Sequence, residues 1–182
     1  MNSDDNAIEP VPQDDAGAQP AAAPVPAPAV SGDGLADAAQ VEQLADKLSA
    51  CADALHERLM REVRAYNGKP VPATTQDALR RLLDDEQVLR QRANGLYADA
   101  AKCIVGTLGK PQKHLMALTA DAAEKIRKIT RIGDSMGLVA RLLGLAAAAA
   151  TGQPAPILLA LEGIKHQLDA IAVHNAPPKP PA

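Results

Sequence analysis

Large apolar residues recur along this chain at steps of three and four positions, the spacing that places side chains on one face of an α-helix. These stripes lie in windows that contain no proline. Because a proline inside a helix costs about 3 kcal/mol, such windows are where long helices can form. The pattern predicts four helices, at about residues 35–66, 75–107, 112–150 and 157–174.

The predicted fold is an all-α, elongated antiparallel bundle with coiled-coil-like packing over residues 34–175. The composition agrees with this class, because the chain has no Phe, no Trp and only two Tyr, whereas strands are enriched in aromatic and β-branched residues. Short connections make successive helices antiparallel neighbours. The fourth predicted helix is the shortest, which leaves part of the other stripes for a partner, and a homo-oligomer is the simplest source of one.

Both ends of the chain differ in composition from this helical part. Residues 1–33 are acidic and rich in Pro and Ala. We predict that they form a disordered tail, because they carry too little apolar surface to offset the entropy of ordering. The Pro-rich residues 176–182 are predicted to be disordered for the same reason. Residues 1–40 hold seven acids and no Lys or Arg, so the total charge of −3 leaves +4 for residues 41–182. That charge is too weak to indicate a nucleic-acid partner.

The second predicted helix carries a heptad repeat, with a seam of the kind that packs against a neighbouring helix. The seam reads Leu79, Leu82, Glu86, Leu89, Ala93, Leu96, Ala100 and Cys103. Glu86 is its one polar member, and Arg90 lies one turn later, where it is placed to pair with that carboxylate. A polar seam residue more often fixes helix register than performs chemistry. Thr74 is the expected N-cap of this helix, with Asp77 completing a near capping box.

Two glycine-containing segments bear on where helices end. Asn67 and Gly68 stand shortly before a proline, an order typical of a left-handed helix cap followed by a breaker. Gly133-Asp134-Ser135 lies inside the third predicted helix. Because the apolar stripe from Leu115 to Leu143 keeps its phase across this segment, we expect a kink or brief distortion there rather than the end of a helix.

The polar face of the third predicted helix vanishes beyond Arg141, and a helix that is apolar on all sides must be enclosed by partners or lie in lipid. Residues 137–161 contain one charge, but a Gly/Pro turn at 151–156 interrupts the run that a spanning helix needs. The five alanines at 146–150 gain little from lipid and allow close helix packing. We therefore expect a protein partner here. The predicted partner or oligomer interface comprises Leu142, Leu143, Leu145, Ala146, Ala149, Ile157, Leu158 and Leu161.

A basic run on the same predicted helix offers a second candidate surface. It consists of Lys125, Arg127, Lys128 and Arg131. Phosphate groups or an anionic lipid surface would attract such charges. Acidic residues interleave with them and aromatic stackers are absent. The first interpretation is therefore an ordinary solvated helix face, with anionic lipid second and nucleic acid third.

No motif in the sequence indicates a reaction. The chain has no P-loop, no Gly-x-Ser-x-Gly, no His-Glu-x-x-His and no Glu-x-x-His pair of the di-iron bundles. Cys51 and Cys103 form no Cys-x-x-Cys pair and are expected to be buried thiols in a reducing cytosol. We expect no catalytic residue, no metal and no cofactor, and hence a protein that is not an enzyme.

These observations favour a non-enzymatic, self-associating helical protein: a scaffold, adaptor or accessory subunit that binds its own copies or another helical protein. The alternative is a peripheral coat of a membrane or lipid body, acting through residues 137–161. In its Ala-rich, aromatic-poor helices and Pro/Ala-rich tail the chain is similar in composition, with no specific motif, to bacterial granule-coating phasins, which implies such a coat. A nucleic-acid accessory protein is the third hypothesis.

The N-terminal sequence bears on the compartment. It lacks the basic start and the apolar run of a signal peptide. We therefore expect a cytoplasmic protein, with the periphery of the inner membrane as the alternative location.

Overall fold

The computed structural model describes residues 35–105, 108 and 111–175, and all regular structure in them is helical. The elements are α1 (Ala38–Ala65), α2 (Ala73–Ala98), a short 3-10 helix η1 (Ala100–Lys102), α3 (Pro111–Lys128), α4 (Ile132–Ala150) and α5 (Pro154–His174). The all-α prediction is therefore confirmed for this part of the chain, with five α-helices in place of four. The predicted tails at 1–33 and 176–182 lie outside the described residues.

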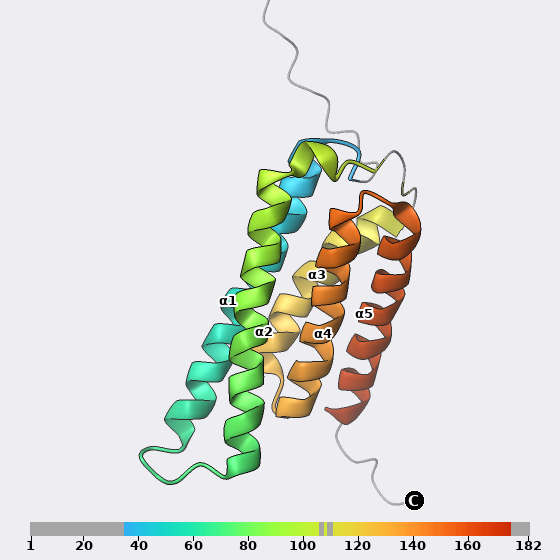
Figure 1. The fold of residues 1–182 in the computed structure, drawn as a ribbon. Coiled ribbons are helices and arrows are strands. Elements are labelled where there is room, and N and C mark those ends of the chain that lie inside the picture. Colours follow the sequence, from blue (N-terminus) through green and yellow to red (C-terminus); the bar gives the residue numbers. More distant parts are fainter. Residues whose placement is uncertain (1–34, 106–107, 109–110, 176–182) are drawn as a thin grey trace, which may run out of the picture. The chain divides into compact units, whose positions relative to one another are not determined.

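The helices pack side by side, and each reverses direction relative to the one before it (Figure 1). Helix α1 packs along α2 and α3, α2 packs along α4, and α4 packs along α5, while α3 and α5 touch more loosely. Since α1 has 28 residues and α3 has 18, their lengths are about 42 and 27 Å at 1.5 Å per residue. The turn between α1 and α2 consequently projects past the ends of α3, α4 and α5 (Figure 1).

The predicted apolar stripes form one shared core. The whole stripe predicted for α5 is buried, from Ile157 to Ile171, and so is the part of the α2 seam from Leu82 to Leu96. The largest fully buried side chains are Leu35, Leu44, Leu48, Leu55, Leu82, Leu89, Leu96, Leu115, Ile126, Leu138, Leu142 and Leu145. Periodicity therefore identified the inward faces of these helices correctly.

The ends of α1 follow local rules that the sequence displays. Asp37 is the N-cap, and its carboxylate accepts a hydrogen bond of 2.8 Å from the Gln40 backbone N–H. At the other end Asn67 and Gly68 adopt positive φ angles of 44° and 78°. This confirms the expected left-handed exit, a conformation that glycine adopts without steric cost and asparagine tolerates.

Both predicted ends of the second helix were wrong. Helix α2 begins at Ala73 with Pro72 as its N-cap and no side-chain cap bond, so Thr74 is already inside the helix and does not cap it. At the other end α2 stops at Ala98 rather than near 107 and gives way to η1. The Val105 N–H then donates to the Leu35 carbonyl at 2.8 Å. That bond ties the segment to the entry of α1, whereas a continuing helix directs each N–H to a carbonyl four residues back.

The expected kink in the third helix is instead a complete break. Helix α3 ends at Lys128, Arg131 is extended (φ −92°, ψ 127°), and α4 starts at Ile132. The cause lies on α1, where the buried guanidinium of Arg58 donates from Nε to the Ile129 carbonyl at 2.8 Å and from Nη2 to the Thr130 carbonyl at 3.1 Å. Because Arg58 satisfies the carbonyls that a helix end leaves without partners, the chain can end α3 there at low cost.

Helix α5 starts three residues earlier than predicted. Gly152 has a φ of 64° and turns the chain after α4, and Pro154 then occupies the first position of α5. A proline at that position loses nothing, because the N–H it lacks has no partner within the helix, and its fixed φ suits the first turn. The prolines at 154 and 156 therefore start this helix instead of preceding it.

Candidate functional site

The surface that the sequence assigned to a partner is mostly covered by the chain itself. Six of the eight predicted interface residues are at most 5% exposed: Leu142, Leu145, Ala146, Ala149, Ile157 and Leu161. Leu143 and Leu158 are half-buried and pack against the same core. Since α4 is packed between α2 and α5, the enclosure that its apolar composition requires is supplied within the chain.

Helix α4 is also the one described helix that is long and apolar enough to cross a membrane. Half of the window that meets this criterion is buried inside the bundle. A core helix of a soluble protein meets the same criterion, so this composition is weak evidence for a membrane span.

The four residues of the basic run lie around the end of α3, and two of them already have acidic partners. Arg127 Nε is 3.1 Å from a carboxylate oxygen of Glu57 on α1, and Lys128 Nζ is 3.2 Å from Glu124 on its own helix. Lys125 is half-buried and Arg131 is exposed. The run therefore contributes less free positive charge than its sequence implies.

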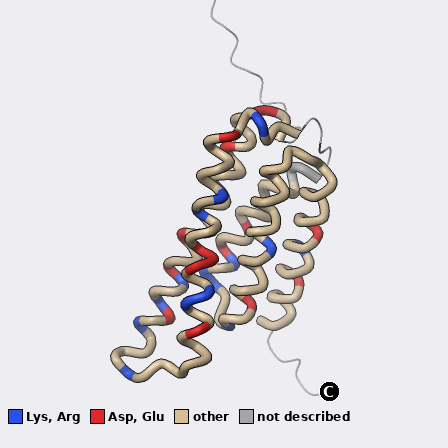
Figure 2. The backbone as a smooth tube through the Cα atoms, viewed as in Figure 1, with Lys and Arg blue, Asp and Glu red and all other residues tan. Residues whose placement is uncertain are grey.

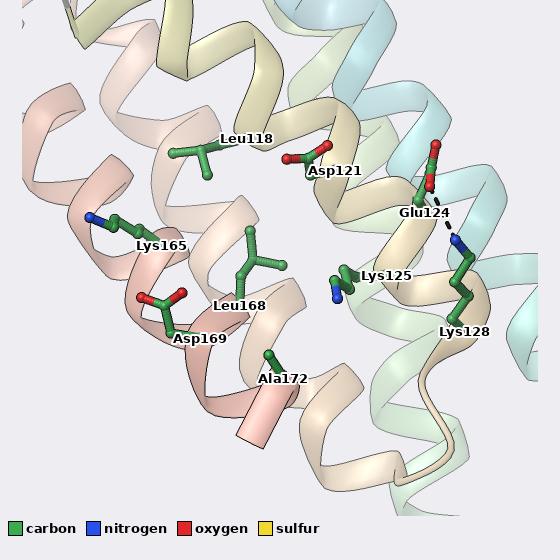
Figure 3. Close-up of a pocket in the computed structure, with 9 residues that line it drawn as sticks. All are labelled: Leu118, Asp121, Glu124, Lys125, Lys128, Lys165, Leu168, Asp169 and Ala172. Atoms are coloured by element: carbon green, nitrogen blue, oxygen red, sulfur yellow. Dashed lines mark hydrogen bonds and ion pairs between the residues drawn. The ribbon is translucent and has the colours of Figure 1, made fainter. Parts of the chain in front are cut away.

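A cleft of about 280 Å³ lies between α3 and α5, where the two helices pack loosely (Figure 3). Leu118, Leu168 and Ala172 give it apolar walls. Its charged residues are three lysines, at 125, 128 and 165, and three acids, Asp121, Glu124 and Asp169. Because the charges balance, this cleft favours neither an anionic nor a cationic ligand.

A second cleft, of about 290 Å³, lies between α2 and α4 and contains Cys103. Burial raises the pKa of the Cys103 thiol, and it raises the pKa of the Cys51 thiol to about 12. Both cysteines are free and buried, as the sequence predicted. A thiol with a raised pKa holds little thiolate near neutral pH, and the thiolate is the nucleophilic form.

The polar residue on the α2 seam is fully satisfied. Glu86 is 5% exposed. One carboxylate oxygen accepts from Arg90 Nε at 2.7 Å, and the other lies 3.2 Å from Nδ1 of His56 on α1. Arg90 also contacts Asp53 at 2.8 Å, and its pKa is raised, chiefly by the hydrogen bond to Glu86. The predicted Glu86–Arg90 pair is confirmed. The contacts of Glu86 with His56 and of Arg90 with Asp53 join α2 to α1, and both carboxylate oxygens of Glu86 have a partner.

A third cleft, of about 140 Å³, lies at the projecting end of α1 and α2, and we call it the tip cleft. Its lining comes from these two helices alone and is formed by Leu59, Met60, Val63, Leu79, Arg80 and Leu83. Val63 is 50% exposed and Leu83 is 39% exposed. The lining begins one residue beyond Arg58, the residue that binds the end of α3, so the cleft lies where α3 no longer accompanies α1.

Both basic and acidic residues lie along the projecting parts of α1 and α2 (Figure 2). Residues 59–83 contain five cations and two acids, and Asp84 and Asp85 follow directly, so residues 59–85 have a net charge of +1. The two acids within residues 59–83 each form an ion pair: Glu62 with Arg58 at 2.6 Å, and Asp77 with Arg80 at 3.7 Å. No ion pair among the described residues involves the four remaining cations, which are Arg61, Arg64, Lys69 and Arg81.

Sequence reasoning missed the tip cleft for a definite reason. Leu59 and Val63 continue the apolar helical spacing of the first predicted helix, and residues at that spacing are expected to be covered; Leu59 is 3% exposed, but Val63 is 50% exposed. The exposure of Val63 follows from where α3 ends, which in turn depends on a contact between Arg58 and carbonyls more than 70 residues later.

No group of three or more His, Cys, Asp or Glu side chains among the described residues is placed to hold a metal ion. Comparison with protein-family models, curated proteins and solved structures finds no match to this chain. The class that the structure itself defines is therefore an all-α protein with a partly exposed apolar cleft on its projecting helix pair.

Proposed function

We propose that this chain is a non-enzymatic helical scaffold, adaptor or accessory subunit that binds a partner helix in the tip cleft. The observation that carries the proposal is the group of partly exposed apolar side chains at that cleft, with Val63 and Leu83 at its edge. Apolar side chains gathered in a groove with a polar rim mark interaction sites. A groove between two helices accepts a third helix whose anchors recur at steps of three and four.

The burial that the tip cleft offers sets the scale of the affinity. Complete burial of a Val or Leu side chain is worth about 1.5–3 kcal/mol, and Val63 and Leu83 retain 50% and 39% of their exposure. Covering both therefore contributes about 2 kcal/mol. Because association has entropic costs of at least several kcal/mol, a stable complex needs contacts on the cleft rim as well, and we expect micromolar rather than nanomolar binding.

The partner in this proposal is a second copy of the chain or another helical protein. Light scattering coupled to size-exclusion chromatography tests self-association, with an expected mass above the 18.9 kDa of one chain at micromolar concentration. The double variant Val63→Ser/Leu83→Ser is expected to reduce that mass towards one chain. Val88→Ser is the matched control, because Val88 is a comparably exposed residue of α2 (37%) outside the tip cleft.

Two results would count against this proposal. A strictly monomeric chain at these concentrations removes self-association and leaves only a different helical protein as partner. An oligomer that the double variant leaves intact removes the tip cleft as the interface.

The second candidate function is a peripheral coat of a membrane or lipid body, acting through residues 137–161 beside Lys125, Arg127, Lys128 and Arg131. It is supported by the hydropathy of α4 and by the exposure of Leu159 (71%) and Val173 (74%) on α5. Insertion would require α4 and α5 to separate from the core. Flotation with anionic vesicles at low salt tests this candidate, and the absence of co-flotation eliminates it.

A further inference from the structure

We infer that Asn67, in the turn between α1 and α2, is a site of spontaneous covalent modification, at which the side-chain amide loses ammonia and becomes a carboxylate. The chain contains two Asn-Gly pairs, Asn67-Gly68 and Asn94-Gly95, and the structure places them in different backbone environments. This inference concerns the chemistry of the turn itself and is independent of whether the tip cleft binds a partner.

The reaction takes place between neighbouring residues and needs only water. The backbone nitrogen of the glycine attacks Cγ of the asparagine, so that a bond from this nitrogen to Cγ forms and the bond from Cγ to Nδ2 breaks. The proton of the glycine N–H leaves with Nδ2 as ammonia, and a succinimide ring remains. Water then opens the ring at one of its two carbonyls, which gives either aspartate or isoaspartate. Glycine favours the attack because it has no side chain to shield its nitrogen and little restriction on its backbone angles.

The turn leaves the Asn67-Gly68 pair open to this attack. Both residues are exposed. The N–H groups on either side are bonded, that of Asn67 to the Arg64 carbonyl at 3.0 Å and that of Lys69 to the Tyr66 carbonyl at 2.8 Å. The attacking N–H of Gly68, by contrast, makes no hydrogen bond within the described part of the chain. A Cβ added to Gly68 would meet nothing within 4 Å, so the attack sacrifices neither a hydrogen bond of the nucleophile nor a packed neighbour.

The second pair has the same local chemistry and a different backbone. Asn94 and Gly95 lie inside α2, where each N–H donates to the carbonyl four residues earlier. The Gly95 carbonyl accepts from the Asp99 N–H at 3.0 Å. The Asn94 side chain is exposed, as that of Asn67 is, so exposure does not distinguish the two sites. Attack on Asn94 requires local opening of the helix, and a reaction that proceeds only through an opened state is slowed by the low population of that state.

The products change the projecting turn in charge and in backbone length. The new carboxylate lowers the net charge of residues 59–85 from +1 to 0. Aspartate tolerates the left-handed conformation that Asn67 adopts at a φ of 44°. Isoaspartate instead directs the main chain through its Cβ, which adds one atom to the connection between α1 and α2. That product therefore does not reproduce the backbone geometry of the turn.

Mass spectrometry of the folded full chain, incubated at mildly alkaline pH, tests the inference. Trypsin cleaves after Arg64 and Arg92, so the two Asn-Gly pairs fall in separate peptides. We expect the Asn67 peptide to gain the mass difference between an amide and a carboxylic acid at least about tenfold faster than the Asn94 peptide. In concentrated urea we expect similar rates, because neither backbone is then held. A sample digested without incubation corrects for reaction during digestion.

Asn67→Gly is the matched variant, because glycine adopts the left-handed conformation without steric cost and has no side-chain amide. We expect it to abolish the mass gain in its peptide and to leave the rate at Asn94 unchanged, with circular dichroism as the check on the fold. Equal rates at the two asparagines in the folded chain overturn the inference, and so does a reaction of Asn67 in urea alone. A mass gain that persists in the corresponding peptide of Asn67→Gly assigns the reaction to another residue and overturns it as well.

Discussion

Replacing Arg58 with alanine is expected to destabilise the fold by about 3 kcal/mol, although the residue touches no cleft. Arg58 is 6% exposed and makes three contacts, to the carbonyls of Ile129 and Thr130 and to the carboxylate of Glu62. A buried acceptor left without a partner costs about 1–3 kcal/mol. The Ile129 carbonyl carries most of this cost, because Thr130 is exposed and water can replace its donor.

Urea unfolding followed by far-UV circular dichroism measures the effect, since the chain has no tryptophan for fluorescence. Glu62→Gln is the matched control. It weakens only the ion pair, in which the Glu62 side chain is 25% exposed, and is expected to cost less than about 1 kcal/mol. If Arg58→Ala unfolds within about 0.5 kcal/mol of the natural chain, then Arg58 does not stabilise the end of α3, and our explanation of the helix break is wrong.

Four further substitutions test other parts of the fold. Glu86→Leu is expected to change the free energy of unfolding by less than about 1 kcal/mol, because Arg90 keeps its contact with Asp53 and a leucine completes the apolar seam; a larger loss in urea unfolding would show that Glu86 is essential to helix pairing. Gly144→Ala is expected to stabilise the chain by about 1 kcal/mol, since an added Cβ meets no atom within 4 Å. Gly152→Ala is expected to destabilise the chain, because φ is 64° and the Cβ would lie 3.2 Å from the Lys102 carbonyl oxygen. Thermal melts in which the two variants shift the melting temperature in the same direction would contradict this. Burial raises the pKa of the Cys51 thiol from 9.0 to about 12, so between pH 9 and 12 the unfolded state loses a proton that the folded state keeps. The free energy of unfolding therefore falls by up to about 1.4 kcal/mol per pH unit in that range. Cys51→Ala is expected to lack this pH dependence, and parallel pH profiles of the two proteins in urea unfolding would refute it.

The sequence predicted well whatever depends on periodicity along one helix. The seam of α2 from Leu82 to Leu96 is buried, and Arg90 pairs with Glu86 one turn away. Such contacts are decided by spacing within a helix, which is visible in a single sequence. The left-handed residues Asn67 and Gly68 were predictable for the same reason, because their conformation depends on local sterics.

What the sequence concealed depends on contacts between distant segments. The apolar stripe keeps its phase from Ile126 to Met136, so nothing local indicated that α3 ends between them. The break follows from Arg58, a residue on another helix whose side chain reaches the carbonyls of Ile129 and Thr130. A charged residue at a predicted helix surface gives no sign that its guanidinium will be buried.

The apolar helix pair formed by α4 and α5 illustrates a second limit. Its composition correctly indicated that Leu142, Leu145 and their neighbours must be enclosed. Composition does not specify the identity of the enclosing surface, and in the structure this surface is formed by the chain's own helices. Of the exposed large apolar residues, Val63 and Leu83 lie at the tip cleft, where α1 and α2 continue beyond the end of α3, whereas Leu159 and Val173 lie on α5.

Hydrogen–deuterium exchange on the full chain, at a concentration where it is monomeric and at one where it self-associates, tests the central claim most directly. It reports which backbone amides become protected on association. We expect slower exchange in residues 59–65 and 79–83, with residues 137–161 unchanged. Protection confined to 137–161, or no change at the tip cleft on association, would contradict the assignment of partner binding to the projecting ends of α1 and α2.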